Sequence, residues 1–337
     1  MGNFDPTLRI DTIHSGKLRR YHSLSSWQQL TNFRAIVLPN LRDSLFVAVG
    51  LLQSFVKLIA WRPDVVFTKG GYVCLPIGLA ARVLGIPLVI HDSDAHPGLT
   101  NRMLAKWATS IGTGAPLKFY PYPISRSHYV GVPVGENFQE PFDVERRAQV
   151  KRDLGLDVRP LVVITGVGLG ARRINDAIAS ILHDLLERAN VILISGERQY
   201  DELRATTPQD DPRYQLHAFV SDGMAMMLGA ADVVVARAGA TTILELAGLA
   251  KPTILIPNGL LTGGHQLKNA AVYAEKGAVS VVDEDALEKH PDVLMDEIVN
   301  ILADTRRQET MARAFHAFAK PHAARDMAGL VLSAVKR

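Results

Sequence analysis

Short apolar runs alternate with longer segments of helical periodicity from about residue 60 onward. The runs are rich in Val, Ile and Leu, and after residue 160 they do not alternate with polar residues. Such runs are typical of parallel strands that are buried on both faces, with a helix following each strand. The pattern predicts α/β architecture with parallel sheets and six strands, namely Asp64–Thr68, Pro87–His91, Leu161–Thr165, Val191–Ser195, Asp232–Ala236 and Thr253–Pro257.

The length of 337 residues favours two domains of roughly 150 residues each. A Pro-punctuated polar stretch, Gly131–Pro160, lies between the two groups of strands and contains a charged helical segment, Asp143–Leu154. The last segment, Pro321–Lys336, has the pattern of a closing helix. We therefore expect one domain over residues 1–135, a second over 136–320, and a C-terminal helix within 321–337 that rejoins the first domain.

The longest apolar segment, Leu45–Trp61, precedes the first strand. It contains Gln53, Ser54 and Lys57 and is slightly short for a bilayer crossing. We expect a helix that is buried or seated on a surface and that does not span a membrane. The first residues, M-G-N-F-D-P, are polar and do not resemble a signal peptide.

Charge is distributed unevenly along the chain. Residues 1–135 contain 14 Lys or Arg and 6 Asp or Glu, a net charge of +8, and the remainder carries −5. The first domain is therefore expected to face an anionic partner, for which lipid headgroups, a diphosphate substrate and nucleic acid are all candidates. The alternative is that charged residues are merely distributed unevenly over a solvated surface, which would give the same charge difference without an anionic partner. The single cysteine, Cys74, excludes an internal disulfide and fits a reducing compartment.

Two polar motifs follow strands of the first domain. The sequence K-G-G-Y-V-C-L-P comes directly after Asp64–Thr68, and its Gly70-Gly71 pair would let backbone amides approach a ligand. A plain turn is the alternative. The sequence H-D-S-D-A-H-P-G-L-T-N follows the next strand, and its carboxylates, Asp92 and Asp94, are the best placed to deprotonate an acceptor hydroxyl. No second group of ligands supports a metal site, so none is expected.

A glycine-rich loop follows the strand Leu161–Thr165. The sequence G-V-G-L-G-A satisfies G-x-G-x-x-A through Gly166, Gly168 and Ala171, just before a helix. Glycines at this position let the backbone approach a phosphate. Taken alone, the motif indicates a dinucleotide cofactor, with Glu197 as the acidic partner, and an NAD-type oxidoreductase remains one reading.

The sequence A-D-V-V-V-A-R-A-G-A-T-T-I-L-E, at 231–245, predicts a strand, a turn and a helix start. Amides from Gly239 to Thr242 would point at an anion beyond the helix, and Glu245 lies one turn further, where it could accept both hydroxyls of a ribose. His265 and Gln266 begin another helix after the next strand. Two such helix starts predict a nucleotide site, although Glu245 could also be a solvated helix carboxylate.

Six motifs in this order resemble the MurG family, the UDP-N-acetylglucosamine transferases that complete lipid II. They are G-G-Y-V, H-x-x-x-x-x-x-G-L-T-N, G-x-P-V, G-A-R-x-x-N, A-D-V-V-V-x-R-x-G-A-x-T-x-x-E and H-Q-x-x-N-A, and they run from about Asp64 to Val282. The resemblance implies the GT-B fold, in which two Rossmann-like domains face a cleft. It also implies inverting transfer of N-acetylglucosamine from UDP-GlcNAc to lipid I, an undecaprenyl-diphosphate-linked muramoyl-pentapeptide, in peptidoglycan synthesis. No cofactor and no nucleic acid partner are implied.

The resemblance also assigns residues and a location. Glu245 would bind the ribose, Val220 would meet the uracil through its backbone, and Gln266 with His265 would hold the sugar hydroxyls. The other donor-side positions that it implies are Gly168, Gly239, Ala240, Thr241, Thr242 and Asn269. The acceptor-side positions are Gly70, Gly71, Tyr72 and Asn101. The basic first domain and the Leu45–Trp61 helix would seat the enzyme peripherally on the cytoplasmic face of the membrane.

Several positions depart from the family pattern. Its first strand and the following G-G-T-G-G-H have no counterpart, so about fifty residues, including a candidate catalytic histidine, are expected to be missing. Asp94 replaces an Asn, Gly135 replaces an Arg, and Gly168 with Leu169 replaces Ser-Gln. We therefore expect an intact donor half and leave the base open. A non-catalytic nucleotide-sugar-binding subunit that needs a partner chain is the alternative.

Overall fold

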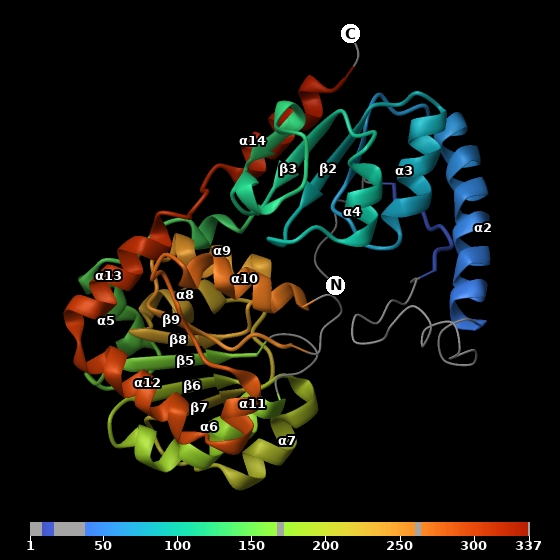
Figure 1. Cartoon of the computed structure of the whole chain (residues 1–337). Coiled ribbons are helices and arrows are strands. Elements are labelled where there is room, and N and C mark those ends of the chain that lie inside the picture. Colours follow the sequence, from blue (N-terminus) through green and yellow to red (C-terminus); the bar gives the residue numbers. More distant parts are fainter. Residues whose placement is uncertain (1–8, 17–37, 167–171, 260–263, 336–337) are drawn as a thin grey trace. The chain divides into compact units, whose positions relative to one another are not determined.

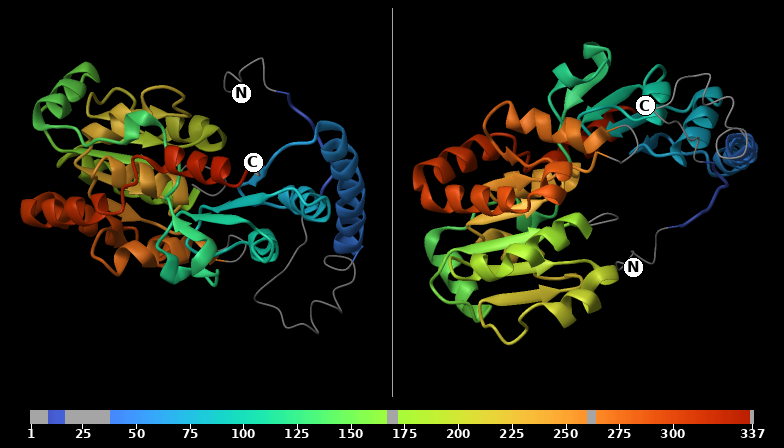
Figure 2. Two further views of the ribbon diagram at one scale, coloured as in Figure 1. Left: turned by 90° about the horizontal axis from the view of Figure 1, so that it is seen from above. Right: turned by 60° about the horizontal axis from the view of Figure 1, so that its bottom comes forward.

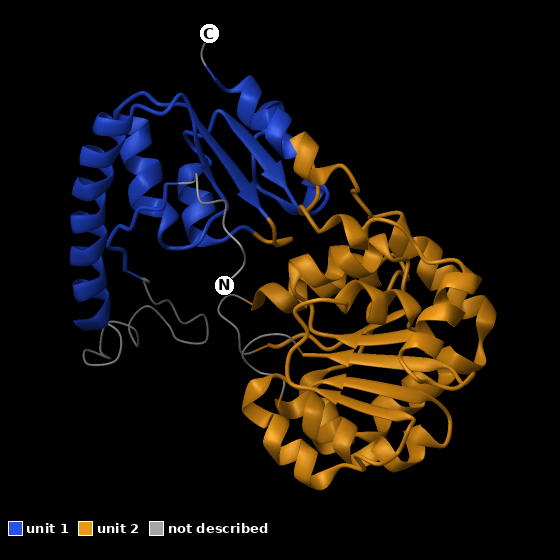
Figure 3. Cartoon of the chain, turned by 180° about the vertical axis from the view of Figure 1, so that it is seen from behind, with its two compact units in different colours: residues 1–92, 97–129, 327–337 blue, residues 93–96, 130–326 orange. Residues whose placement is uncertain are grey.

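The computed structural model describes residues 9–16, 38–166, 172–259 and 264–335. The chain divides into two compact units (Figure 3). Unit 1 comprises residues 1–92, 97–129 and 327–337, and unit 2 comprises residues 93–96 and 130–326. The boundary expected from the sequence lay at residue 135, with a returning segment at 321–337.

Unit 1 is built on a four-stranded parallel sheet in the order β1-β2-β3-β4 (Figure 1). The order follows the chain, so each strand pairs with the next through a crossover. The carboxyl ends of β1 and β2 therefore lie at one edge, which brings together the segments that follow them. The strands are β1 Val66–Thr68, β2 Leu88–Asp92, β3 Ser110–Thr113 and β4 Ser127–Tyr129. The helical segments are α2 Leu38–Trp61, α3 Cys74–Val83, α4 Leu99–Leu104, η2 Leu117–Phe119 and η3 Ile124–Arg126.

Helix α2 is longer than the sequence pattern suggested. It has 24 residues and begins at Leu38, whereas the expected apolar segment began at Leu45 and was judged too short for a bilayer. By length and composition alone, α2 is the one helix in the described residues that could cross a membrane, so the judgement of its length was wrong. A helix that is buried or seated on a surface stays the prediction. Helix α2 lies beside α3 (Figures 1 and 2). Its buried residues include Asp43, Ser54 and Leu58, which share one face of the helix.

Unit 2 contains a six-stranded parallel sheet in the order β10-β9-β8-β5-β6-β7. The chain runs outward from β5 to β7, returns to the other side of β5 at β8, and continues outward to β10. This is the strand order of dinucleotide-binding Rossmann domains, with the reversal between β5 and β8. The strands are β5 Leu161–Thr165, β6 Asn190–Ile194, β7 Tyr214–His217, β8 Val233–Ala236, β9 Thr253–Leu255 and β10 Ser280–Val281.

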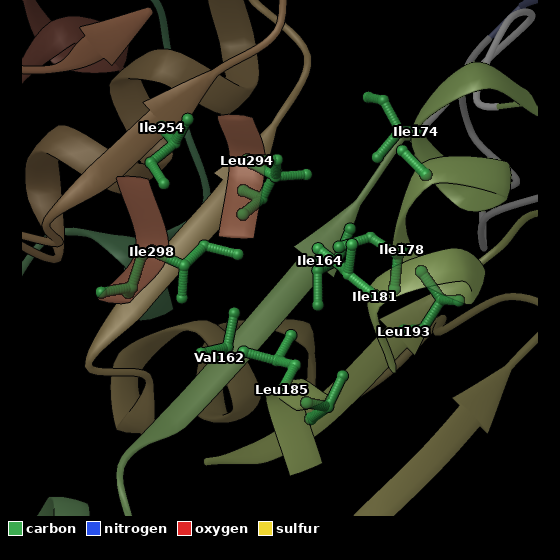
Figure 4. Packing of buried hydrophobic residues seen from close by; sticks show 14 of the residues in the cluster. Val162, Ile164, Ile174, Ile178, Ile181, Leu185, Leu193, Ile254, Leu294 and Ile298 are labelled. Carbon is green, nitrogen blue, oxygen red and sulfur yellow. The ribbon is translucent and has the colours of Figure 1, made fainter. Parts of the chain in front are cut away.

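Helices cover both faces of this sheet, and the core lies between β5 and the helices on one side. Figure 4 shows Val162 and Ile164 of β5 packed among Ile178 and Leu185 of α6, with Ile298 of α12 nearby. All five side chains are buried, which fixes the central strands and the loops at their ends. The helical segments of unit 2 are η4 Glu136–Phe138, α5 Val144–Asp153, α6 Arg172–Leu186, α7 Glu197–Thr206, α8 Met224–Ala230, α9 Ala240–Gly248, α10 His265–Ala274, α11 Glu284–Lys289, α12 Asp292–Ala303 and α13 Thr305–His316. Helix α14, Ala323–Ser333, begins in unit 2 and belongs to unit 1 from residue 327.

The six predicted strands are all present, and each is found within two residues of its expected bounds. The charged helix is confirmed as α5, whose first turn is capped by the Asp143 carboxylate accepting from Arg146 N. Four short strands, β3, β4, β7 and β10, were not predicted. They have two to four residues each and include polar residues, so no apolar run marks them in the sequence.

Candidate functional site

The candidate donor site lies at the reversal in strand order of unit 2. Open α/β sheets bind ligands beyond the carboxyl ends of the strands where the order reverses, here β5 and β8. The loop after β5 includes Gly168, which lies outside the described residues. The described part of the site therefore consists of the turn after β8 and the segments that contact it.

Helix α9 begins with backbone donors that the helix itself leaves unpaired. Gly239 is its N-cap, with extended backbone angles and no side-chain capping bond. The first hydrogen bond back to this residue comes from Ile243 N to Gly239 O at 2.9 Å. The amides of Ala240, Thr241 and Thr242 therefore precede the helical ladder, at the positive end of the helix dipole. This arrangement suits an anionic ligand such as a diphosphate.

Glu245 lies on α9, one turn beyond this helix start. Its side chain is half-buried, and desolvation raises the pKa of its carboxyl above the ordinary value. A carboxylate without full hydration gains from hydroxyl donors, which a ribose supplies in a pair. A perturbed carboxyl beside a helix start is a candidate binding group rather than a solvated surface residue.

Helix α10 begins at His265, as expected, and places two polar side chains in its first turn. Gln266 Oε1 accepts from Asn258 N at 2.8 Å, which holds the segment after β9 against the helix. His265 Nδ1 is buried and has no hydrogen-bond partner among the residues that the structure describes. Its ring lies 6.4 Å from that of His96, centroid to centroid.

Asn269 ties two candidate segments together within unit 2. Its side chain is 2% exposed, and Nδ2 donates to Asp94 Oδ1 at 2.9 Å and to Ala238 O at 3.0 Å. Its Oδ1 accepts from Ala95 N at 2.8 Å. Asn269 therefore holds Asp94 next to the turn that starts α9. Sequence analysis placed Asn269 among the donor residues and did not reveal this link.

Val220 follows β7 and precedes α8, in the loop at the carboxyl edge of the sheet. Its side chain is half-buried, and the neighbouring Phe219 is 68% exposed. The backbone of this loop is thus placed at the same edge as the start of α9, as a contact to a base requires.

Arg237 has a structural role that the sequence did not indicate. It is buried at the end of β8, forms an ion pair with Glu284 at the start of α11, and donates to Ile256 O at 3.1 Å. Glu284 also lies 3.8 Å from Arg173 of α6. Because burial of one charge alone is costly, the pair fixes the turn before Gly239 through its partners. The 47-residue separation of the partners hides the pair from sequence reasoning.

The acceptor-side candidates lie in unit 1. Gly70 and Gly71 both have φ of +84°, which explains the Gly-Gly pair, and a Cβ at Gly70 would lie 2.9 Å from Asn101 Nδ2. Asn101 is buried and donates to His91 O at 3.1 Å, while its Oδ1 has no hydrogen-bond partner within the described part of the chain. Tyr72 is exposed. The structure therefore brings Gly70 and Asn101 together at the edge formed by β1 and β2.

The two candidate catalytic carboxylates have different surroundings. Asp92 is 4% exposed and accepts from the Tyr122 hydroxyl at 2.7 Å. Asp94 is only half-buried and is held by Asn269. Of the two, Asp94 is the carboxylate that a hydroxyl group from outside the protein can reach.

Comparison with known families matches both halves of the chain. The glycosyltransferase family 28 N-terminal domain matches residues 9–113, and the C-terminal domain of the same family matches residues 161–327. The two matches cover unit 2 from β5 onward and most of unit 1.

Curated relatives share one printed function, UDP-N-acetylglucosamine–N-acetylmuramyl-(pentapeptide) pyrophosphoryl-undecaprenol N-acetylglucosamine transferase. The protein from an Exiguobacterium species is 33% identical over 300 residues, covering 88% of this chain and 81% of the relative. The protein of this name numbered 1 from Bacillus cereus is 32% identical over 307 residues, covering 90% of this chain and 83% of the relative.

Solved structures agree on the fold. MurG of Acinetobacter baumannii superposes with a TM-score of 0.70 at 25% identity, over 86% of this chain and 79% of that one. The UDP-GlcNAc 2-epimerase of Neisseria meningitidis, solved with UDP-GlcNAc, has a TM-score of 0.63 at 12% identity, over 86% and 81%, and so shares the fold alone. Two parallel-sheet α/β units of GT-B type are thus established. The oxidoreductase reading of the loop after β5 has no support from these relatives, and the chain belongs to the MurG family of UDP-N-acetylglucosamine transferases within glycosyltransferase family 28.

Proposed function

We propose that this protein transfers N-acetylglucosamine from UDP-GlcNAc to lipid I, the undecaprenyl-diphosphate-linked muramoyl-pentapeptide, and so forms lipid II. The observation that carries the proposal is the start of α9, where amides that precede the helical hydrogen bonds and the half-buried Glu245 lie on one helix beside the strand reversal. The printed function of relatives at 31–33% identity supports the same donor and acceptor.

The donor would be held by the carboxyl edge of unit 2. The amides of Ala240 to Thr242 would bind the diphosphate, and Glu245 would accept from the ribose hydroxyls. The backbone at Val220 would contact the uracil. His265 and Gln266, in the first turn of α10, would contact the sugar hydroxyls. The remaining donor-side proposals are Gly168, Gly239 and Asn269.

The reaction breaks the bond between the anomeric carbon and the UDP oxygen and forms one to the acceptor 4-hydroxyl, with inversion. The hydroxyl proton would pass to the carboxylate of Asp94. The electron pair of the broken bond would leave with UDP, and the dipole and amides of α9 would stabilise this added charge. Neither step needs a metal ion or an organic cofactor.

The acceptor would be bound at the edge of unit 1 where Gly70, Gly71, Tyr72 and Asn101 lie. Helix α2 would hold unit 1 on the cytoplasmic membrane surface. Its exposed apolar residues recur every three or four positions, at Leu41, Leu45, Val49, Leu52, Val56 and Ile59, so they form one face opposite the packed one. A helix with one face packed on α3 and the other apolar and exposed is suited to lie in the interface.

Isothermal titration calorimetry with UDP-GlcNAc tests the donor half of this proposal. We expect saturable binding with one site per chain, weakened by about 10-fold or more in Glu245→Ala because hydrogen bonds to a charged group are lost. Glu309→Ala, which changes an exposed glutamate on α13, is the matched control and should bind as the wild type does. Absence of binding, or equal affinity in Glu245→Ala and wild type, would refute the donor site.

The alternative function, a non-catalytic nucleotide-sugar-binding subunit, shares this donor site and differs only in turnover. Calorimetry should therefore be paired with a measurement of UDP release in the presence of a lipid I analogue. Binding accompanied by UDP release supports the transferase, and binding without release supports the subunit.

A further inference from the structure

Glu284 lies between two arginines that come from the two sides of the strand reversal in unit 2. Its side chain is 7% exposed and pairs with Arg237, directly after β8, and its Oε2 lies 3.8 Å from Nη1 of Arg173 in the first turn of α6. Strand β5 precedes α6, strand β8 precedes α9, and the two strands are neighbours in the sheet. The Glu284 carboxylate therefore connects the starts of the two helices that flank the reversal.

Helix α11 holds the Glu284 carboxylate in a fixed place. The Asp283 carboxylate caps this helix by accepting from Asp285 N at 3.0 Å and from Ala286 N at 2.9 Å. Leu287 of the same helix is buried in the hydrophobic core of unit 2. Because its helix is both capped and anchored in the core, Glu284 offers the two arginines a partner that does not move.

The other carboxylates near Arg173 lie at the surface. Asp285 Oδ1 accepts from Arg173 Nη1 at 3.0 Å, and Glu288 Oε2 lies 3.0 Å from Arg173 Nη2. Both carboxylates are more than half exposed, and exposed ion pairs contribute little. Glu284 is the buried carboxylate of the group, and it is the one that also pairs with Arg237.

The charge of Glu284 has the wrong sign for an anion site. Helices α6, α9 and α11 all begin after parallel strands of one sheet, so their first turns lie at the same edge. The positive ends of the α6 and α9 dipoles favour a diphosphate there, whereas a carboxylate repels it. Electrostatics alone thus predicts that removal of the Glu284 charge strengthens diphosphate binding. A role in positioning predicts the opposite.

We propose that Glu284 is a positioning residue for the donor diphosphate: by pairing with Arg237 and Arg173 it sets the spacing between the start of α9 and the start of α6. With this spacing both helix starts act on one diphosphate. Glu284 acts through the two arginines and does not contact the donor. The inference rests on the proposed function, because it needs the donor site at α9, and it adds a residue outside that site on which diphosphate binding depends.

Isothermal titration calorimetry with UDP and with uridine separates positioning from a general loss of structure, because only UDP carries the diphosphate. Glu284→Gln keeps the size of the side chain and removes its charge. We expect its affinity for UDP to fall by about 10-fold, because the charge-assisted pairs that set the spacing are lost, and its affinity for uridine to stay as in the wild type. Unchanged or tighter UDP binding, or an equal loss of UDP and uridine affinity, overturns the proposal.

Glu284→Asp is the second variant, because it leaves a charge beside the buried Arg237 and so guards against unfolding. It shortens the reach to Arg173, and we expect UDP to bind about 3-fold more weakly or worse, again with uridine unaffected. Uridine and UDP affinities that both equal those of the wild type would contradict the positioning role.

Glu288→Gln is the matched control on the same helix. It makes the same change at an exposed carboxylate that pairs with Arg173, and it should bind UDP and uridine as the wild type does. A loss of UDP affinity equal to that of Glu284→Gln would show that the link to Arg237 is not needed, and the proposal would be wrong. If the wild type binds no UDP, the proposed donor site fails and this role fails with it. If the wild type binds UDP and the Glu284 variants bind it equally well, the donor site stands and only the positioning role fails.

Discussion

At the scale of single residues, burial sets the chemistry of two ionisable side chains in unit 2. Desolvation raises the pKa of Glu245 on α9 and lowers that of Lys251, which lies just before β9. Lys251 is 4% exposed and donates to Gly229 O at 2.6 Å and Ala231 O at 3.1 Å. The first group is a proposed ligand contact, whereas the second bonds to backbone carbonyls of unit 2, so we expect their titrations to affect different properties.

The titration of Glu245 should be visible in uridine binding. In the free protein its pKa is raised by desolvation, and ribose hydroxyls bind the charged form better, so the association constant should rise as the pH increases and Glu245 ionises. Uridine is the proper probe because it has no phosphate whose own titration would contribute. Glu245→Gln should remove the pH dependence, and calorimetry at several pH values measures it. Affinity in the wild type that is constant or falls with pH would contradict a ribose contact.

The titration of Lys251 should be visible in stability. Its pKa falls from 10.5 to about 7 on folding, so between these values the unfolded chain binds more protons and the free energy of unfolding rises with pH. This residue adds up to about 1.4 kcal/mol per pH unit in that window. Urea unfolding of wild type and Lys251→Met between pH about 7 and about 9 isolates its contribution. The free energy of unfolding of the wild type minus that of Lys251→Met should increase with pH. Lys276→Met, at an exposed position, should show the same pH dependence as the wild type. A difference in the free energy of unfolding that does not change with pH would contradict a lysine that loses its proton on folding.

At the scale of elements, the sequence predicted the starts of helices better than their contacts. The starts of α9 and α10 follow from Gly239 and from His265-Gln266, since local turns and apolar periodicity decide them. What the sequence could not predict are links between distant segments. Asn269 contacts Asp94 across 175 positions and Tyr122 contacts Asp92 across 30, and only the folding of each unit brings these pairs together.

Asn269 should be a stabilising link as well as a positioning one. Asn269→Ala leaves the buried groups Ala238 O and Ala95 N without their partner, and each such loss costs about 1–3 kcal/mol. We expect the free energy of unfolding to fall by about 2–4 kcal/mol, measured by urea denaturation. Lys268→Ala, at an exposed position of the same helix, should change it little. If both substitutions lower the free energy of unfolding equally, the hydrogen bonds of Asn269 do not stabilise the fold.

At the scale of the whole molecule, the chain combines a basic half with an apolar exposed helix. Residues 1–135 carry a net charge of +8, and the large apolar side chains on the exposed face of α2 are 37–69% exposed. Charge asymmetry was evident from the sequence. The direction of the apolar face was not, because only the packing of α2 on α3 decides which side remains exposed.

Vesicle flotation tests whether this face binds a membrane. The double variant Leu52→Glu/Val56→Glu places two carboxylates on the exposed face, and binding to vesicles with anionic lipid should fall by about 10-fold or more. Val158→Glu, at a fully exposed apolar position in unit 2, is the control and should bind as the wild type does. High salt should weaken wild-type binding, because part of the attraction is electrostatic. Binding that survives the double variant would place the contact elsewhere.

The transfer reaction itself is the most direct test of the central claim. The measurement is the structure of the product formed from UDP-GlcNAc and a lipid I analogue, determined by NMR spectroscopy and mass spectrometry. The account predicts one N-acetylglucosamine joined through an inverted anomeric carbon to the acceptor 4-hydroxyl, with one UDP released for each product and loss of turnover in Asp94→Ala. UDP-GlcNAc bound tightly but never transferred, or a product of retained configuration, would contradict it.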